Sequence, residues 1–539
     1  MTVYLSKSLL NSFRQCPRRL WLELQDSRAR REGRPAIAQK QYSADALKRF
    51  AEGHVVGRIA QAMWPSGVDI ESAALKNSKG KKRDLNESKR LTHQAIEQGL
   101  PLFEATFEHD ALLIQADVLL PERNGWQMLE VKSSSNPKAY HYADLATQAW
   151  VAEQSGIALS RVGLLLVNKS FALERAGDYT GFLQIHEDQE LQESVREHMQ
   201  AMPSTVSAAR DMALQHQEPT QHEPGEQCTD PFECPYQAHC AKPESGPLAD
   251  EVPIRFYRDT GGEKAQQLIQ RGYSDLRLVP EEIMSQIWDK HSEAHQINRR
   301  LALAARTGAP VLEREAVRKA LDAFTWPVQH LDFETINLTA PVWPGTQSGQ
   351  QVPFQYSLDV QNRDGSLVPN AHREFLDVSG NDPRRALAQR LVKDLSPEHT
   401  ILAWNATFER TVIRALAGQF PDLKTDLLRL LDCVEDLLPV VRQNYAHPGM
   451  PHANVPMFSI KTVLPMLVPG MNYDQLDGVQ NGGDAQASYL RVAAPKSVRQ
   501  RAGYSEAERQ LEIDNMLRYC AMDTEAMVVI TKALVDPIN

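Results

Sequence analysis

The stretch HLDFETINLT, residues 330–339, places two carboxylates one residue apart within a short apolar run. Side chains two residues apart in a strand point to the same face, so Asp332 and Glu334 are expected to project together. Like charges at that distance repel each other, and folding alone offers nothing that compensates for the repulsion. The pair therefore predicts a divalent metal ion that both carboxylates bind.

The size and composition of the chain restrict its class. A chain of 539 residues is too long for one hydrophobic core and predicts two to four domains. It contains no apolar run of about 18 residues and no apolar N-terminal segment of the kind found in secretory signals, so a cytoplasmic location is expected. The net charge of −10 argues against a generally basic surface but permits a local basic groove for nucleic acid.

Two α/β blocks joined by a helical connector are expected, with boundaries at residues 1–242, 243–323 and 324–539. Apolar runs and helical periodicity define the elements of each block. In the first block, strands are predicted over residues 100–109, 111–122, 125–135 and 161–171, with a helix over 140–156. In the second block, strands are predicted over residues 327–337, 353–362 and 372–379, a helix over 383–395, a strand entering a helix over 400–409, and a helical C-terminus.

The first block carries a candidate site on two neighbouring strands. Asp117 ends the apolar run LLIQAD, and the run LEVK supplies Glu130 and Lys132 on one strand face. Carboxylates bind Mg²⁺ or Mn²⁺, which activates water and offsets the charge that builds on a phosphodiester. A lysine beside them orients the water or stabilises that charge. The residue types suit phosphodiester cleavage, although Glu-Val-Lys on a half-exposed strand is common.

The spacing D-x12-E-x-K, followed by a helix with Gln148, resembles the RecB-like branch of the PD-(D/E)XK nuclease superfamily over about 240 residues. The resemblance implies a restriction-endonuclease-like fold in which Asp117 and Glu130 bind the metal. Lys132 and Gln148 would complete the catalytic set. Many relatives have a histidine four residues after a helical glycine, but here that position is Gly57. His54, expected on a different face of the helix, and Glu52 are the possible substitutes.

Four of the six cysteines form a second pattern in this block. Cys16 precedes its predicted strands, and Cys228, Cys234 and Cys240 follow them within thirteen residues of one another. Four thiolates suit an iron–sulfur cluster or a zinc ion equally well. Some RecB-like nucleases have one cysteine before the nuclease core and three after it, and this resemblance implies a [4Fe-4S] cluster. The spacing C-x5-C-x5-C departs from the usual C-x2-C pair, and zinc or unliganded cysteines remain alternatives.

The second block supplies further ligands for the opening pair. Glu409 is expected on the first turn of a helix that follows a strand, and Tyr519 and Asp523 lie four residues apart on the C-terminal helix, hence on one face. Four carboxylates from separate elements can hold two divalent ions about 4 Å apart. A tyrosine hydroxyl beside them can position the attacking water.

The order D-x-E, N-x2-F-E, Y-x3-D resembles the DEDD, or DnaQ-like, 3′–5′ exonuclease family in its tyrosine-type subclass, with an RNase H-like fold. The resemblance implies that Asp332, Glu334, Glu409 and Asp523 bind Mg²⁺ or Mn²⁺ and that Tyr519 is catalytic. Glu409 stands where relatives have aspartate, and its extra methylene alters the geometry. Candidate substrate contacts are Asn405, Ser459 and Lys461. Ser459 and Lys461 could instead mark only a strand-to-helix junction. Asp432 and Asp436 are reserve candidates for a carboxylate of this metal site.

The combination resembles a bacterial family in which a RecB-like iron–sulfur module precedes a DnaQ-like domain. It implies a metal-dependent nuclease that acts as a 3′–5′ exonuclease on single-stranded DNA, while the N-terminal module cleaves or grips the strand. DNA is favoured over RNA only by analogy. Two alternatives stay open: a nucleic-acid-binding protein with degenerate nuclease sites, and an exoribonuclease in RNA processing.

Overall fold

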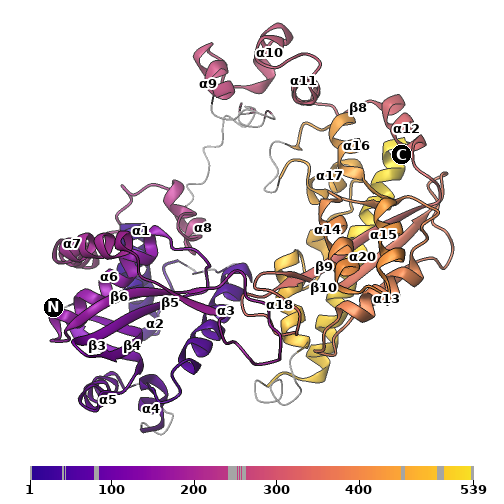
Figure 1. Ribbon diagram of the computed structural model, residues 1–539. Helices are drawn as coiled ribbons and strands as arrows, with labels where there is room; N and C mark the ends of the chain where they lie inside the picture. Colours follow the sequence, from indigo (N-terminus) through magenta and orange to yellow (C-terminus); the bar gives the residue numbers. More distant parts are fainter. Residues whose placement is uncertain are drawn as a thin grey trace. The chain divides into compact units, whose positions relative to one another are not determined.

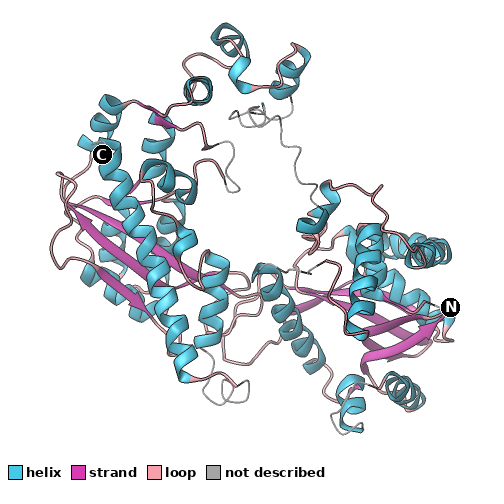
Figure 2. Ribbon diagram, turned by 180° about the vertical axis from the view of Figure 1, so that it is seen from behind, coloured by secondary structure: helices cyan, strands magenta, loops and turns pink. Residues whose placement is uncertain are grey.

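The computed structural model describes residues 3–38, 40, 42, 44–77, 84–240, 252, 254, 257, 263–450, 456–493 and 503–535. The chain divides into two compact units, each with helices and a mixed sheet (Figures 1 and 2). Unit 1 comprises Met1–Lys242 and Asn337–Gln350, and unit 2 comprises Pro243–Ile336 and Gln351–Asn539. The boundary expected at residues 242–243 lies outside the described residues, and the expected connector is part of unit 2.

The centre of unit 1 is formed by the four strands that the apolar runs predict. Strands β3 and β4 pair antiparallel, as do β4 and β5, whereas β5 and β6 pair parallel with helix α6 between them in the sequence. Short edge strands complete the seven-stranded sheet and were not expected. The strands are β1 (Leu5–Ser6), β2 (Val68–Asp69), β3 (Leu102–His109), β4 (Leu112–Glu122), β5 (Gly125–Lys132), β6 (Leu159–Val167) and β7 (Leu183–His186).

Helices pack on this sheet in more than one hydrophobic cluster, one of which includes α6. Leu145 and Ala149 of α6 are fully buried together with Ile114 of β4 and Leu164 of β6. The side chain of Ser6 caps the first helix by accepting a hydrogen bond from the backbone N–H of Leu9 at 3.3 Å, as a serine N-cap does. The helices are α1 (Lys7–Gln15), α2 (Pro17–Arg31), α3 (Ala44–Ala62), α4 (Ile70–Asn77), α5 (Leu85–Glu97), α6 (Ala139–Gln154), α7 (Gln189–Ala213) and α8 (Gln237–Cys240).

Unit 2 contains a five-stranded sheet in the order β11-β10-β9-β12-β13. Its strands confirm the predicted elements and add the short β13: β9 (Val328–Asn337), β10 (Gln351–Gln361), β11 (Arg373–Leu376), β12 (Ile401–Ala403) and β13 (Val434–Asp436). The apolar residues Leu331, Phe333, Tyr356 and Leu358 pack against three helices in one core. These helices are α13 (Arg384–Asp394), α14 (Thr407–Gln419) and α15 (Lys424–Asp432).

The alternate residues of β10 are polar, buried and hydrogen-bonded to the last helix, α20 (Glu506–Val535). Gln355 Nε2 donates to the carbonyl of Met516 at 2.8 Å, and Gln361 Nε2 donates to the carbonyl of Val528 at 3.0 Å. Between them, the hydroxyl of Thr524 lies 3.0 Å from that of Ser357 and donates to Asp359 Oδ2 at 2.7 Å. This row of bonds fixes where α20 sits along the strand.

The rest of unit 2 is mostly helical, as the charged sequence before residue 324 predicts. One small core joins residues of α9, α10 and α11, with Trp288 at its centre. The remaining elements are α9 (Glu263–Gln270), α10 (Glu281–Ile287), α11 (Glu293–Thr307), β8 (Val311–Leu312), α12 (Arg314–Asp322), α16 (Leu437–Asn444), β14 (Tyr445–Ala446), α17 (Ile460–Leu467) and α18 (Gly482–Val492). Among the helices that the structure describes, none has the length and apolar composition of a membrane span.

Replacing Thr524 by valine tests the row of hydrogen bonds between β10 and α20. The change keeps the shape but removes the hydroxyl that Asp359 and Ser357 share, so we expect the free energy of unfolding to fall by about 1–3 kcal/mol in urea denaturation. Thr531→Val is the matched control, because Thr531 is also buried and its hydroxyl binds, among the described residues, the carbonyl of Met527 one turn earlier and no other group. Equal losses in the two variants would contradict a special role for Thr524.

Candidate functional site

Three carboxylates from two elements of unit 2 meet in one place. Strand β9 carries Asp332 and Glu334, and helix α20 carries Asp523. One ligand atom of each residue lies within 4.8 Å of those of the other two. Within the described parts of the chain, no other three histidine, cysteine or acidic side chains meet this condition. The structure thus brings together the opening pair and the distant aspartate, as the resemblance implies.

Burial raises the pKa of each carboxyl of this triad. Burial, and then the charges of Asp523 and Glu334, raises the pKa of Asp332 well above its usual value. Burial, followed by the charge of Asp523, raises the pKa of Glu334 to about 8. Burial raises the pKa of Asp523 to about 6, opposed by hydrogen bonds and by the ammonium of Lys461. Three carboxylates this close, with Glu334 and Asp523 buried and Asp332 half-buried, are the donor set that a hard divalent cation takes.

Glu409 lies beside the triad but outside its tightest group. It stands on the first turn of α14, after the short strand β12, and is buried. Burial raises its pKa to about 8, with further contributions from Asp436 and Asp523. Its Oε2 atom finds no hydrogen-bond partner among the described residues. A buried carboxylate oxygen without a partner is costly, and a bound cation would satisfy it.

The reserve carboxylates are less suited to metal binding. Asp436 caps α16, where its Oδ1 accepts hydrogen bonds from the backbone N–H groups of Leu438 at 2.9 Å and Asn405 at 3.0 Å. Asp432 is exposed at the end of α15. Both side chains are therefore explained by local structure or by solvent.

Two tyrosines and a lysine adjoin Asp523. Tyr519, predicted from its spacing on α20, is buried, and its pKa is raised by burial and then by Asp523. Tyr473 was not predicted: it is buried on a short 3-10 helix (Tyr473–Gln475), and its hydroxyl donates to Asp523 Oδ1 at 2.5 Å. Lys461 Nζ lies 5.0 Å from the ring centroid of Tyr473 and 5.2 Å from that of Tyr519. Burial lowers the pKa of Lys461, against the pull of Asp523 and Glu334.

The other two predicted substrate contacts, Ser459 and Asn405, lie just before helices. The hydroxyl of Ser459 caps α17 by accepting the backbone N–H of Lys461 at 3.1 Å, which is the helix-junction role that the sequence left open. Asn405 is exposed and adopts a left-handed conformation, with φ of 63°, at the turn between β12 and α14. Cys520 was missed, and its Sγ atom lies 3.8 Å from Asp332 Oδ2.

The predicted residues of unit 1 also converge. Lys132 Nζ lies 2.8 Å from Glu130 Oε1 and 2.5 Å from Asp144 Oδ2. The amide of Gln148 on α6 donates to Glu130 Oε2, and Asp117 Oδ2 accepts the backbone N–H of Val131 at 2.8 Å. Sequence reasoning missed Lys7 on α1, whose ammonium donates to Glu130 Oε1 at 3.0 Å. No local pattern marks Lys7, because it lies 123 residues from its partner.

Lysines decide the charge state of this second site. Burial opposes ionisation of Glu130, but the ammonium groups of Lys132 and Lys7 outweigh it and lower the pKa of the carboxyl. Burial, and then the charge of Glu130, raises the pKa of Asp117 to about 8. Glu130 therefore already has its positive partners, whereas Asp117 does not hold its charge at neutral pH.

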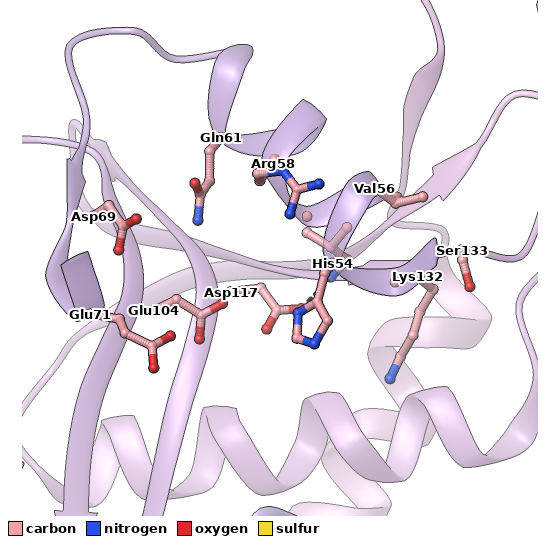
Figure 3. Close-up of a pocket in the computed structure, with 13 residues that line it drawn as sticks. His54, Val56, Arg58, Gln61, Asp69, Glu71, Glu104, Asp117, Lys132 and Ser133 are labelled. Atoms are coloured by element: carbon pink, nitrogen blue, oxygen red, sulfur yellow. Dashed lines mark hydrogen bonds between the residues drawn. The ribbon is translucent and has the colours of Figure 1, made fainter. Parts of the chain in front are cut away.

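A pocket of about 460 Å³ opens beside Asp117 and Lys132 (Figure 3). Its lining residues are Gly53, His54, Val56, Gly57, Arg58, Gln61, Asp69, Glu71, Glu104, Asp117, Val131, Lys132 and Ser133. The expectation that His54 lies on a different helix face from Gly57 is wrong, because residues three apart on a helix are neighbours and both line the pocket. Glu52 instead accepts a hydrogen bond from the hydroxyl of Thr339 at 2.9 Å.

The four cysteines of unit 1 line one cavity. Cys16, between α1 and α2, meets Cys228, Cys234 and Cys240 there, and all are free thiols. Burial raises the pKa of Cys234, and it raises that of Cys240 to about 11. Four free thiols from distant parts of the chain suit an iron–sulfur cluster or zinc, either of which binds the thiolate form. Their sulfurs are not among the closely grouped ligand atoms found within the described residues.

Comparison with known proteins gives one match. The sequence profile of a family described as "Domain of unknown function (DUF2779)" matches residues 329–452. The match covers Asp332, Glu334 and Glu409 but ends before Tyr473 and Asp523. Neither a curated protein nor a solved structure matches the chain.

Glu334→Gln removes one of the repelling charges of the triad. Because the pKa of Glu334 is raised from 4.5 to about 8, the stability that its neutral form contributes is full below pH 4.5 and is lost as the pH rises through 8. With a chelator present, we expect the variant to melt above the wild type at pH 9, by on the order of 5 °C, and close to it at pH 5. Mn²⁺ should reverse the order at pH 9, because only the intact triad gains full binding free energy. A difference independent of pH in thermal melts would contradict this account.

Tyr473→Phe removes the hydroxyl that orients Asp523. Side chains that hold metal ligands in place typically contribute about 10- to 100-fold to metal affinity, so we expect the Kd for Mn²⁺ to rise about 10-fold or more in calorimetric titrations. Tyr489→Phe is the matched control, since Tyr489 is also buried in unit 2 and its hydroxyl has no hydrogen-bond partner among the described residues. Wild-type affinity in Tyr473→Phe would show that Asp523 needs no such support.

Proposed function

We propose that the chain is a metal-dependent nuclease whose unit 2 shortens single-stranded nucleic acid from its 3′ end. The observation that carries the proposal is the convergence of Asp332, Glu334 and Asp523 within 4.8 Å. The resemblance to the tyrosine-type DEDD exonucleases, with an RNase H-like fold in unit 2, supplies the reaction class and the direction. The neighbouring Glu409 supports it, because its unpartnered oxygen adds a donor for a second ion.

Each side chain of the site has a role in this reaction. Asp332, Glu334 and Asp523 bind Mg²⁺ or Mn²⁺, with Glu409 completing the donor set. If two such ions are bound there, they would supply an activated water and positive charge against the charge that develops on the phosphate. Tyr519 donates its hydroxyl proton to a hydrogen bond that orients the water. Lys461, held over both tyrosine rings, places an ammonium where the phosphate backbone can pair with it.

For unit 1, we propose a PD-(D/E)XK-like fold that grips the strand. Glu130 is already compensated by Lys7 and Lys132, so it offers little to a metal ion. The cavity shared by Cys16, Cys228, Cys234 and Cys240 supports a [4Fe-4S] cluster, with zinc as the alternative. Such a cluster would tie the N-terminal helices to the end of the unit. DNA is proposed as the substrate over RNA on the resemblance alone.

The proposal is tested with single strands of DNA and RNA labelled at either end, in the presence of Mn²⁺. We expect 5′-labelled DNA to shorten progressively and 3′-labelled DNA to release its label at once. Asp332→Asn should reduce kcat about 100-fold or more, because it removes a metal ligand. Lys132→Ala should raise KM and leave kcat largely unchanged, because it acts on binding.

Other outcomes distinguish the alternatives. Loss of cleavage in Lys132→Ala but not in Asp332→Asn would move the activity to unit 1. Binding without cleavage in the wild type would identify a nucleic-acid-binding protein, and faster shortening of RNA an exoribonuclease. In protein purified without oxygen, a broad absorbance near 400 nm is expected from the iron–sulfur cluster, and its absence together with bound zinc would replace the cluster by zinc.

A further inference from the structure

One face of helix α3 forms a wall of the pocket in unit 1 and extends beyond it. His54, Arg58 and Gln61 line the pocket from this helix (Figure 3). Phe50 precedes His54 by four residues and therefore lies on the same face, one turn further toward the N-terminus. The face thus runs from the pocket to an exposed aromatic ring.

That ring belongs to a small aromatic platform. Phe50 is 51% exposed and Tyr42 is 38% exposed, and their centroids are 5.2 Å apart in an edge-to-face arrangement. Lys40 Nζ, which also pairs with Glu23 at 3.5 Å, lies 5.0 Å from the centroid of the Tyr42 ring. The three residues together offer the exposed ring of Phe50, packed edge-to-face against Tyr42, near the ammonium group of Lys40. Such a combination is the usual means of holding an unstacked base and its phosphate.

Two glycines leave the middle of this face without side chains. Gly53 and Gly57 both line the pocket, in the interior of a helix where glycine is less favourable than alanine. Packing does not require them, because a Cβ atom added at either position would meet nothing within 4 Å. Neither has the positive φ that would demand glycine. Open space on a helix that tolerates a larger residue indicates room kept for a ligand.

We propose that this face of α3 binds single-stranded nucleic acid, with a base stacked on Phe50 and the backbone passing over Gly53 and Gly57 into the pocket. The inference rests on the proposed function and identifies where unit 1 holds its strand. A single strand fits because its bases present their flat faces, whereas those of a duplex are stacked on one another. Lys40 lies beside the Tyr42 ring and Arg58 lines the pocket, and each can pair with a phosphate.

The test measures the anisotropy of a fluorescein-labelled oligothymidine, with Ca²⁺ in place of Mg²⁺ to screen the acidic wall of the pocket. Loss of a stacked base should raise the Kd of Phe50→Ala about 5- to 150-fold, and Phe50→Trp should restore binding. Leu214→Ala is the control: Leu214 is 49% exposed at the end of α7, outside this face, and its replacement should change nothing. A duplex of the same length should bind weakly and respond little to any of these changes.

Gly57→Leu gives an independent measurement. It should weaken strand binding while leaving the melting temperature equal to or above that of the wild type, because the added side chain enters open space and leucine favours the helix. Wild-type affinity in both Phe50→Ala and Gly57→Leu would overturn the inference and leave the exonuclease proposal intact. If the wild type binds no single strand at all, the proposed function and this inference fail together.

Discussion

The site in unit 2 depends on a sheet with two unlike faces. On β9 and β10, Leu331, Phe333 and Tyr356 face the helices of the core, while the residues between them are polar and face α20. Burying a polar face is costly unless each group finds a partner. Here Gln355, Ser357, Asp359 and Gln361 each form a hydrogen bond with α20, and the strand beside them can then carry Asp332 and Glu334 toward the same helix. Among the described residues, Lys461 is the cation that acts on Glu334 and Asp523 there.

The two acidic sites solve the same electrostatic problem differently. In unit 1, Glu130 is compensated from within by two lysines, and its pKa is lowered. In unit 2, burial and the charge of Asp523 raise the pKa of Glu334, and the charge of Lys461 opposes them without outweighing them. A buried charge needs either an internal counterion or an external one. In unit 1 the lysines already neutralise the charge of Glu130, whereas in unit 2 a bound cation would neutralise the charge of the carboxylates.

Local sequence patterns predicted the features formed by residues close together in the chain. They missed the features that depend on contacts between residues far apart in the chain. The alternating apolar runs predicted β3 to β6 and β9 to β11, and helical spacing brought Tyr519 and Asp523 to one face. Tyr473 and Lys7 carry no comparable signal, because a single tyrosine or lysine gains its role from a partner 50 or 123 residues away. The short strands β2 and β7 escaped for a related reason: two to four residues are too few to show a period.

The segment Asn337–Gln350 belongs to unit 1, although the strand before it belongs to unit 2. It is held by scattered polar bonds, among them Lys48 to Asn337 and Tyr179 to the carbonyl of Pro341 at 3.0 Å. Such bonds depend on the tertiary fold and leave no periodic trace in the sequence. The boundary predicted at residue 324 assigns everything after it to the second block. In the structure, residues 337–350 return to unit 1 before the chain continues in unit 2.

The raised pKa values of Glu334 and Glu409 mean that at neutral pH these carboxyls carry protons in the metal-free protein. A cation that binds must displace those protons into solvent, so metal uptake is an exchange of ions and not a simple addition. The apparent affinity therefore rises with pH until the carboxyls are fully ionised. Protons from the solvent compete with the metal ion for the same carboxylate oxygens. The pH therefore sets what fraction of the protein has metal bound.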